Sequence, residues 1–334
     1  MKKEAKKASQ RARGACADST AAGRFSDATL CSAADAVTVP VHCTLCPRRC
    51  GADRTRTQGF CGGGARVRLA RAALHFWEEP CISGTRGSGT VFFSGCPLQC
   101  CYCQNYRISA QNFGKEISVQ RLAEIFLGLQ TQGAHNINLV SATQYLPWVL
   151  AALRLAKPAL CIPVVYNTGG YEAPEALAAL DGFVDIYLTD LKYCSPTLSA
   201  AYSGAADYFD VASAAARAML RQTGAPQYSA DGTLRRGTIL RHLALPGAAQ
   251  DSADVLDFFA TLPRGGFLLS LMSQYTPFYK ACEHKPLTRR ISTYEYRQII
   301  NRAVALGLTD GYLQKKSSAK EEYTPDFNCE GVEE

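Results

Sequence analysis

The sequence contains no apolar run long enough to cross a membrane. A spanning helix needs about 18 or more apolar residues, and residues 145–155, among the longest apolar stretches, are interrupted by Pro147 and Arg154. The basic N-terminus is not followed by the apolar segment of a secretory signal. The body of the chain also lacks the basic, aromatic-interleaved stripe of a nucleic-acid-binding surface. We therefore expect a cytoplasmic protein without a membrane or nucleic-acid partner.

The composition is that of an ordinary globular protein. The 334 residues are 47% hydrophobic and 19% charged, and the net charge of +7 comes largely from the N-terminus. A chain of roughly 300 residues buries about three quarters of its unfolded surface, so disulfides are not needed to support a core. The 15 cysteines lie in clusters along the sequence. This clustering favours metal binding over a disulfide framework.

Strand-like and helix-like segments alternate after residue 90. Ser118, for example, caps a helix whose apolar residues recur at the i, i+3, i+4, i+7 spacing. Such alternation predicts a parallel sheet, since each crossover between parallel strands requires a connection that a helix supplies. The predicted strands are 90–95, 137–141, 162–166, 184–190, 238–245 and 267–271, with 310–314 as an additional strand, and the helices begin at Ser118, Pro147 and Pro174 or span 200–223, 251–262 and 292–306.

The sequence divides into four predicted parts. Residues 1–38 form a disordered basic tail, and residues 39–85 form a cysteine-rich metal module with its linker. Residues 86–316 form an α/β domain, an open or incomplete (β/α)6 barrel, and residues 317–334 form a C-terminal tail. Ligands of such folds bind at the carboxyl ends of the strands, so the residues that follow each strand are the candidates for chemistry.

A cysteine array follows the first predicted strand. Cys96, Cys100 and Cys103 form a C-x3-C-x2-C pattern in a loop. A structural zinc site uses four ligands, whereas three cysteines on a cubane iron–sulfur cluster leave one iron open to a small ligand. The array predicts a reactive [4Fe–4S] centre, with a three-cysteine zinc site or buried thiols as the alternatives. Cys101 is an extra thiol that we do not expect to be a ligand.

This loop, with Tyr102 as the aromatic residue before its last cysteine, resembles that of the radical S-adenosylmethionine (SAM) superfamily. Residues 90–105 are similar to those of pyruvate formate-lyase activating enzymes, and residues 43–314 resemble their uncharacterised relatives. The resemblance implies a radical-SAM-type barrel in which the open iron binds the amino and carboxylate groups of SAM. It also implies reductive cleavage of SAM to methionine and a 5′-deoxyadenosyl radical, with the cofactors supplying the chemistry.

The resemblance extends to residues after the later strands. Residues 141–144 stand where the family has a Gly-Gly-Glu stretch that contacts the methionyl amino group, and residues 167–170 resemble its Asp-Thr-Asn-Gly turn. Asp190 and Lys192 match its Asp-x-Lys contacts to ribose and carboxylate, or form an ordinary ion pair. Arg241 matches a fifth-strand arginine, or is a structural cation. His242 points to the opposite face and packs against a helix. The predicted cofactor-binding residues are Tyr102, Ser141, Thr143, Asn167, Asp190, Lys192 and Arg241.

A second cysteine cluster lies upstream. Cys43, Cys46, Cys50 and Cys61 occupy a glycine-rich stretch without strand or helix periodicity. Four thiols can close a tetrahedral site, and both zinc and an auxiliary iron–sulfur cluster would stabilise such a module; a redox dithiol is the third possibility. In the linker, residues 75–84 contain an acidic pair and an aromatic pair, for which lining the site competes with ordinary packing.

These observations predict a radical SAM enzyme that abstracts hydrogen from its substrate. Its partners would be SAM and an electron donor such as flavodoxin or ferredoxin. The substrate is either a glycine on a glycyl radical enzyme, as the resemblance to activating enzymes implies, or a small molecule or peptide. A non-catalytic iron–sulfur electron carrier is the alternative from another class.

Overall fold

The computed structural model describes residues 37–314 and 325–333. Most of the predicted basic tail (residues 1–36) and half of the predicted C-terminal tail (residues 317–324 and 334) lie outside the described residues. The core is a ten-stranded sheet in which nine strands follow the order β10-β9-β8-β6-β5-β4-β2-β1-β3 and β7 (Gln227–Tyr228) pairs with β8. Since β10 and β3 lie at opposite ends of this order, the sheet is open, as predicted.

Seven parallel strands form the predicted part of the sheet. They are β2 (Ser88–Phe93), β4 (Ile137–Val140), β5 (Val164–Thr168), β6 (Ile186–Asp190), β8 (Leu234–Leu243), β9 (Leu268–Met272) and β10 (Gly311–Leu313). Every residue of β2 and β4 is buried, as expected for strands that are covered on both faces. The alternation of strand and helix in the sequence is therefore confirmed, with small shifts of strand ends.

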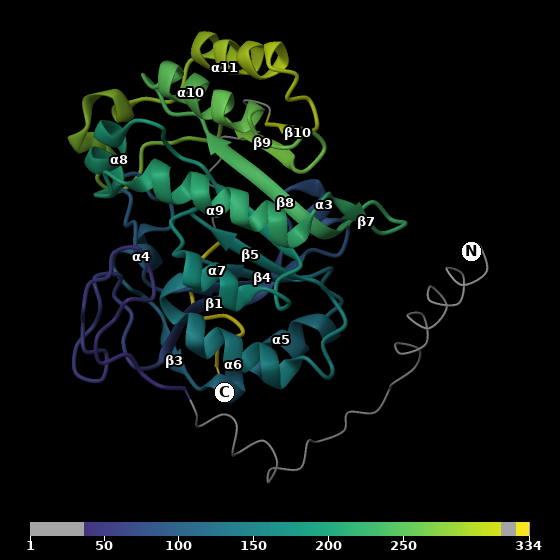
Figure 1. Ribbon diagram of the computed structural model, residues 1–334. Coiled ribbons are helices and arrows are strands. Elements are labelled where there is room, and N and C mark those ends of the chain that lie inside the picture. The colour runs from purple at the N-terminus through teal and green to yellow at the C-terminus, as the bar shows by residue number, and fades with distance from the viewer. Residues whose placement is uncertain (1–36, 315–324, 334) are drawn as a thin grey trace. The chain divides into compact units, whose positions relative to one another are not determined.

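Helices connect the strands and pack across the sheet (Figure 1). Leu122, Ile125, Phe126 and Leu129, the apolar residues predicted to share one helix face, are all buried, and the Ser118 side chain caps their helix by accepting from the amide of Arg121 at 3.0 Å. The longer helices are α5 (Val119–Thr131), α6 (Leu146–Ala156), α7 (Pro174–Leu180), α8 (Pro196–Ser203), α9 (Tyr208–Thr223), α10 (Ala249–Ala260) and α11 (Thr293–Ala305).

The helix predicted over residues 200–223 is wrong as a single element. Gly204 ends α8 in the left-handed conformation, and α9 begins at Tyr208. Glycine adopts this conformation without the steric penalty of a side chain, which makes it a common helix stop. The apolar pattern alone did not reveal the break because both helices pack on the same core.

The prediction of no strand before residue 70 is also wrong. Strand β1 (Val67–His75) pairs antiparallel with β2, and β3 (Lys115–Ile117) pairs antiparallel with β1. The C-terminal residues 325–333 then lie along β1, where the amide of Cys329 donates to the carbonyl of Ala70 and the amide of Ala72 donates to Glu330. The end of the chain thus covers the outer strand. Within the described residues, no helix combines the length and apolarity of a bilayer-spanning segment.

Candidate active site

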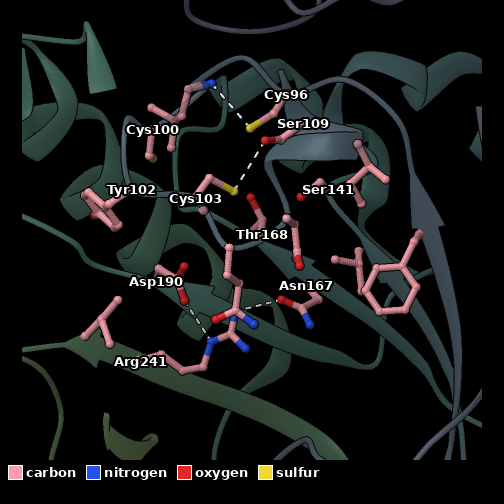
Figure 2. Close-up of a pocket in the computed structure, with 18 of the residues that line it drawn as sticks. Cys96, Cys100, Tyr102, Cys103, Ser109, Ser141, Asn167, Thr168, Asp190 and Arg241 are labelled. Carbon is pink, nitrogen blue, oxygen red and sulfur yellow. Dashed lines mark hydrogen bonds and ion pairs between the residues drawn. The ribbon is translucent and has the colours of Figure 1, made fainter. Parts of the chain in front are cut away.

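The carboxyl ends of the parallel strands surround a cavity of about 250 Å³. Six of the seven residues predicted to bind the cofactor line it, as do all three cysteines of the array (Figure 2). The strand order explains the convergence, since loops that are distant in sequence leave the same edge of one sheet. The lining residues from these predictions are Cys96, Cys100, Tyr102, Cys103, Ser141, Asn167, Asp190, Lys192 and Arg241.

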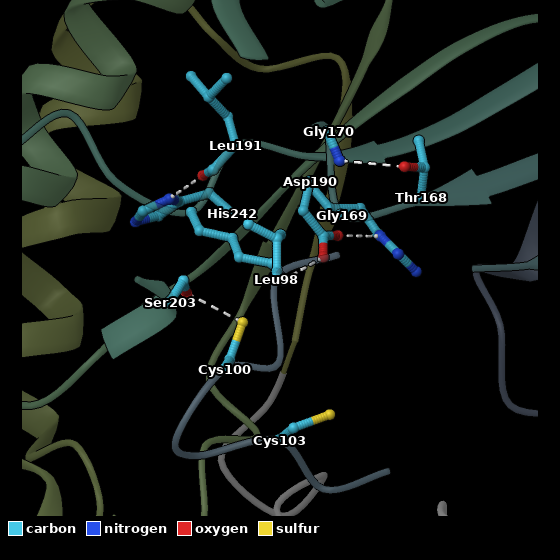
Figure 3. A network of polar contacts seen from close by, with 12 residues as sticks. Leu98, Cys100, Cys103, Thr168, Gly169, Gly170, Asp190, Leu191, Ser203 and His242 are labelled. Carbon is cyan, nitrogen blue, oxygen red and sulfur yellow. Dashed lines mark hydrogen bonds and ion pairs between the residues drawn. The ribbon is translucent and has the colours of Figure 1, made fainter. Parts of the chain in front are cut away.

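Each cysteine of the array accepts a hydrogen bond at its sulfur. The amide of Leu98 donates to Cys96 at 3.4 Å, the hydroxyl of Ser109 donates to Cys103 at 3.3 Å, and the hydroxyl of Ser203 donates to Cys100 at 3.0 Å (Figures 2 and 3). These donors come from three different parts of the chain. They orient the thiols and would stabilise negative charge on sulfur.

Burial opposes ionisation of the Cys96 and Cys103 thiols. Desolvation raises the pKa of Cys96 to about 12 and also raises the pKa of Cys103, although the Lys192 cation lowers the latter in part. A coordinating metal deprotonates its thiol ligands outright. The donor set, three hydrogen-bonded thiols on one loop beside an open cavity, fits a cluster with a vacant iron position.

The loop between the cysteines is held by its backbone. The amide of Cys101 donates to the carbonyl of Tyr202 at 2.8 Å, and its carbonyl accepts from the amide of Lys280 at 2.9 Å. Tyr102 is buried, accepts from the hydroxyl of Tyr193 at 2.6 Å and packs edge-to-face on the ring of Tyr275. Tyr102 therefore anchors the cysteine loop in a cluster of buried tyrosines that includes Tyr193 and Tyr275.

A chain of buried ion pairs crosses the cavity. Asp190 accepts from Lys192 Nζ at 2.5 Å and from Arg241 Nε at 2.7 Å, and Arg241 also donates to Asn167 Oδ1 at 2.7 Å. Strand register produces this contact, because Asp190 on β6 is the direct partner of Arg241 on β8. Burial raises the pKa of Asp190, but Arg241 and Lys192 outweigh it and leave the pKa below its ordinary value.

The turn after β5 requires a glycine. Gly170 has φ +84°, and a Cβ atom there would overlap the carbonyl oxygen of Asp190. Tyr208 of α9 fastens the same region, because its hydroxyl lies 2.8 Å from the carbonyl of Gly169 and accepts from the amide of Lys192 at 2.9 Å. The predicted turn at residues 167–170 is thus held against the end of β6.

Thr143 lies apart from the cavity. Its hydroxyl is buried and donates to Glu172 at 2.6 Å, so the predicted contact of this hydroxyl with a cofactor does not match its placement. Ser141 lines the cavity instead, at a φ of +58°. Gln144 links residues 141–144 to the start of the cysteine loop, since its side-chain amide nitrogen lies 2.9 Å from the carbonyl of Ser94 and 3.0 Å from that of Gly95.

His242 occupies the predicted opposite face of β8. Its Nδ1 lies 2.8 Å from the carbonyl of Leu191, and its Nε2 lies 2.9 Å from the hydroxyl of Ser252 on α10 (Figure 3). Burial lowers its pKa to about 4. This neutral histidine links the sheet to a helix, as predicted, and takes no part in the cavity.

The upstream cysteine module packs directly against the cysteine loop. The amide of Cys96 donates to the carbonyl of Cys61 at 3.0 Å, and Gly95 is required there because a Cβ atom at its φ of +82° would overlap that carbonyl. Arg48 donates to the carbonyl of Pro97 at 2.8 Å and to those of Ser203 and Gly204. The pattern search did not single out Arg48, because only its long-range contacts distinguish it from other basic residues.

The four module thiols occupy one neighbourhood. Cys43, Cys46 and Cys61 are buried and Cys50 is exposed. Burial raises the pKa of Cys61, and the nearby thiols of Cys43 and Cys50 add to this increase. Arg54, 1% exposed, lies beside them and donates to the carbonyls of Gln144 and Gly64. In residues 37–314 and 325–333, no three His, Cys, Asp or Glu side chains are arranged to hold a single metal ion.

The linker contributes to the cavity. Glu78 and Trp77 both line it, whereas Glu79 does not. Glu78 accepts from the side-chain amides of Asn138 and Asn167, each at 3.2 Å, and lies 3.6 Å from Arg241. Trp77 and Glu78 of the linker therefore line the site, which is one of the two roles considered for residues 75–84, the other being ordinary packing.

The chain is similar to known proteins over much of its length. Residues 90–223 match the radical SAM superfamily. An uncharacterized protein of Methanocaldococcus jannaschii is 29% identical over 265 residues, which cover 76% of this chain and 71% of the relative.

Two solved structures are similar at lower levels. A domain of a pyruvate-formate lyase-activating enzyme from Bacteroides vulgatus has a TM-score of 0.38 and 16% identity, with 51% of this chain and 92% of that domain covered. Streptococcus suis SuiB bound to S-adenosylmethionine has a TM-score of 0.45 and 10% identity, with 66% of this chain and 48% of SuiB covered.

Proposed function

The chain carries a radical SAM domain at residues 90–223, and from this premise we propose that it cleaves SAM reductively at a [4Fe–4S] cluster held by Cys96, Cys100 and Cys103. The observation that supports the proposal is that the three thiols share one cavity with the Asp190–Lys192–Arg241 ion pairs. When bound, the cluster supplies the electron that splits the sulfonium and starts hydrogen abstraction from a substrate.

The residues of the chain bind and orient the cofactor in this proposal. Lys192 interacts electrostatically with Cys100 and Cys103, and it offers the cofactor carboxylate a charge-assisted hydrogen bond. Asp190 holds Lys192 and accepts from a ribose hydroxyl, and Asn167 and Ser141 supply further polar groups on the same wall. The buried surroundings strengthen each of these contacts.

We further propose that Cys43, Cys46, Cys50 and Cys61 hold a second metal centre, either zinc or an iron–sulfur cluster. The proximity of the four thiols and the direct backbone hydrogen bond between Cys61 and Cys96 support this assignment. A reduced flavodoxin or ferredoxin is the proposed electron donor. A protein rich in free thiols suits a reducing compartment, for which we propose the cytoplasm.

The test is anaerobic reconstitution with iron and sulfide, followed by reduction with dithionite in the presence of SAM. We expect 5′-deoxyadenosine by chromatography, together with about four irons per chain if the module holds zinc and about eight if it holds a second cubane cluster. Zinc is measured in the same samples.

A matched pair of variants sharpens the result. Cys100→Ala should abolish deoxyadenosine formation, whereas Cys101→Ala should retain it, because Cys101 anchors the loop only through its backbone amide and carbonyl. Loss of cleavage in Cys101→Ala would refute the ligand assignment. A fully loaded cluster that neither binds nor cleaves SAM would instead indicate an electron carrier.

A further inference from the structure

A buried charge cluster beside one end of the cavity holds more carboxyl groups than cations, although one member, Glu79, does not line the cavity. Asp190, Glu78 and Glu79 provide three carboxyl groups, whereas Lys192 and Arg241 provide two cations, and all five side chains are at most about 15% exposed. Uncompensated charge is costly in such surroundings. The excess lies on the glutamate side, since Asp190 alone already engages both cations at 2.7 Å or less.

Glu78 lies at the end of the cavity remote from the thiols. Figure 2 shows Cys96 and Cys103 at one end and Asn167 and Arg241 at the other. Glu78 contacts Asn138, Asn167 and Arg241 at this second end. Burial raises its pKa, and the Arg241 cation opposes this increase.

A neighbouring group also requires a hydrogen-bond donor. Asn138 is fully buried and donates its amide to Glu78 at 3.2 Å, but its Oδ1 has no partner. A buried, unpaired acceptor is destabilising unless a donor satisfies it. Asn138 does not line the cavity, so Glu78 is the member of this pair that a ligand with N–H groups reaches.

Aromatic rings also line the cavity. Trp77 and His75 precede Glu78 on the linker, and both line the cavity with Phe92, whose ring meets that of His75 edge-to-face at 6.1 Å. Aromatic rings next to a carboxylate attract organic cations, since the ring quadrupole adds to the ionic contact. Neither the Glu78 carboxylate nor the aromatic rings favour an anionic ligand.

We propose that Glu78 is a specificity-determining residue that binds the substrate through an ammonium or guanidinium group. The inference rests on the proposed function, to which it adds the chemical class of the substrate. The same charge can belong to a free amine or guanidine, or to a lysine or arginine side chain of a peptide. Arg241 acts as a positioning residue that holds Glu78 in the cavity.

The experiment measures binding to the reconstituted, SAM-saturated protein by calorimetry. The probes are agmatine, the peptide acetyl-Gly-Arg-Gly-amide, neutral 1,4-butanediol and anionic glutarate. The cationic probes should bind at least tenfold more tightly than the other two. Agmatine alone binding would indicate a small amine substrate, and the peptide binding more tightly would indicate a polypeptide; both results support the cationic class.

Variants assign the effect to Glu78. Glu78→Gln should weaken agmatine binding at least tenfold, Glu78→Asp should restore the preference for cations, and Glu175→Gln, on the surface of α7, is the matched control. Iron content and circular dichroism show whether each variant is folded. The proposal is overturned if all probes bind alike, or if Glu78→Gln weakens SAM binding as much as agmatine binding. Agmatine binding through Glu78 without deoxyadenosine formation would overturn only the proposed function.

Discussion

Replacing Asp190 by asparagine isolates the energetic contribution of the buried ion pairs. Asp190 accepts from Lys192 at 2.5 Å and from Arg241 at 2.7 Å, and the three side chains are 13–15% exposed. Asparagine keeps the size of the side chain and one acceptor oxygen, so the substitution creates no cavity. What it removes is the only negative charge that contacts both cations in this network.

The expected cost is large for a nearly isosteric change. Removing one partner from a buried pair costs about 3–5 kcal/mol, because the remaining charge is left without compensation. Here Arg241 keeps a weaker contact with Glu78 at 3.6 Å, which places the expected loss of unfolding free energy near the lower limit, about 3 kcal/mol. The pKa of Asp190 is depressed in the folded protein, because the cations outweigh burial. Its contribution is therefore complete above the unfolded pKa of about 4 and is lost as pH falls through the folded pKa.

Urea unfolding of the metal-free, reduced protein at pH 7 measures this cost. The matched control is Asp257→Asn, which breaks an ion pair with Arg302 whose two side chains are 44–45% exposed. That variant should lose only about 0–1 kcal/mol. Similar losses in the two variants would refute the claim that the Asp190 network is buried and mutually dependent.

Three other substitutions test separate features. Burial raises the pKa of Glu172 to about 7, so the folded protein keeps a proton that the unfolded chain releases near pH 4. The free energy of unfolding measured in urea should therefore fall as pH rises from about 4 to about 7, and Glu172→Gln should flatten this slope. Gly170→Ala should destabilise the protein by at least about 1 kcal/mol more than Gly182→Ala. Both glycines have positive φ, but only a Cβ atom at Gly170 would overlap a backbone carbonyl, that of Asp190. Equal losses of unfolding free energy in urea would contradict this overlap. Arg54→Met should cost at least about 2 kcal/mol by leaving two buried carbonyls unpaired, whereas Arg56→Met, at an 85% exposed side chain, should stay within about 0.5 kcal/mol in the same assay.

The parallel part of the fold was predictable because its signals are local. Strand-like and helix-like segments alternate with caps and prolines at their ends, and these features depend on residues close in sequence. Strands β1 and β3 lack this advantage. Strand β1 pairs with β2 and hydrogen-bonds to residues 325–333, and β3 pairs with β1, so contacts beyond their short-range pattern determine both strands.

The site was predictable to the extent that spacing and strand ends determine it. The cysteine array and the residues after β4, β5 and β6 could be located because parallel strands deliver their carboxyl ends to one edge. The partners of Thr143 and Glu172 could not be inferred, since their hydrogen bond joins turns 29 residues apart. Glu78 was recognised only as a member of an acidic pair, because its place beside Arg241 depends on a contact between β8 and a loop far upstream.

The attachment of the cysteine module to the rest of the fold has a consequence for the order of events during synthesis. Arg48 finds its acceptor at Gly204, 156 residues later, and Arg54 finds its acceptor at Gln144, 90 residues later. At roughly 5–20 residues per second, the ribosome needs on the order of 10 s to make the first of these partners available. During that interval the module thiols are on a nascent chain without their packing partners. Until those partners are made, a reducing environment is what keeps these thiols from oxidation.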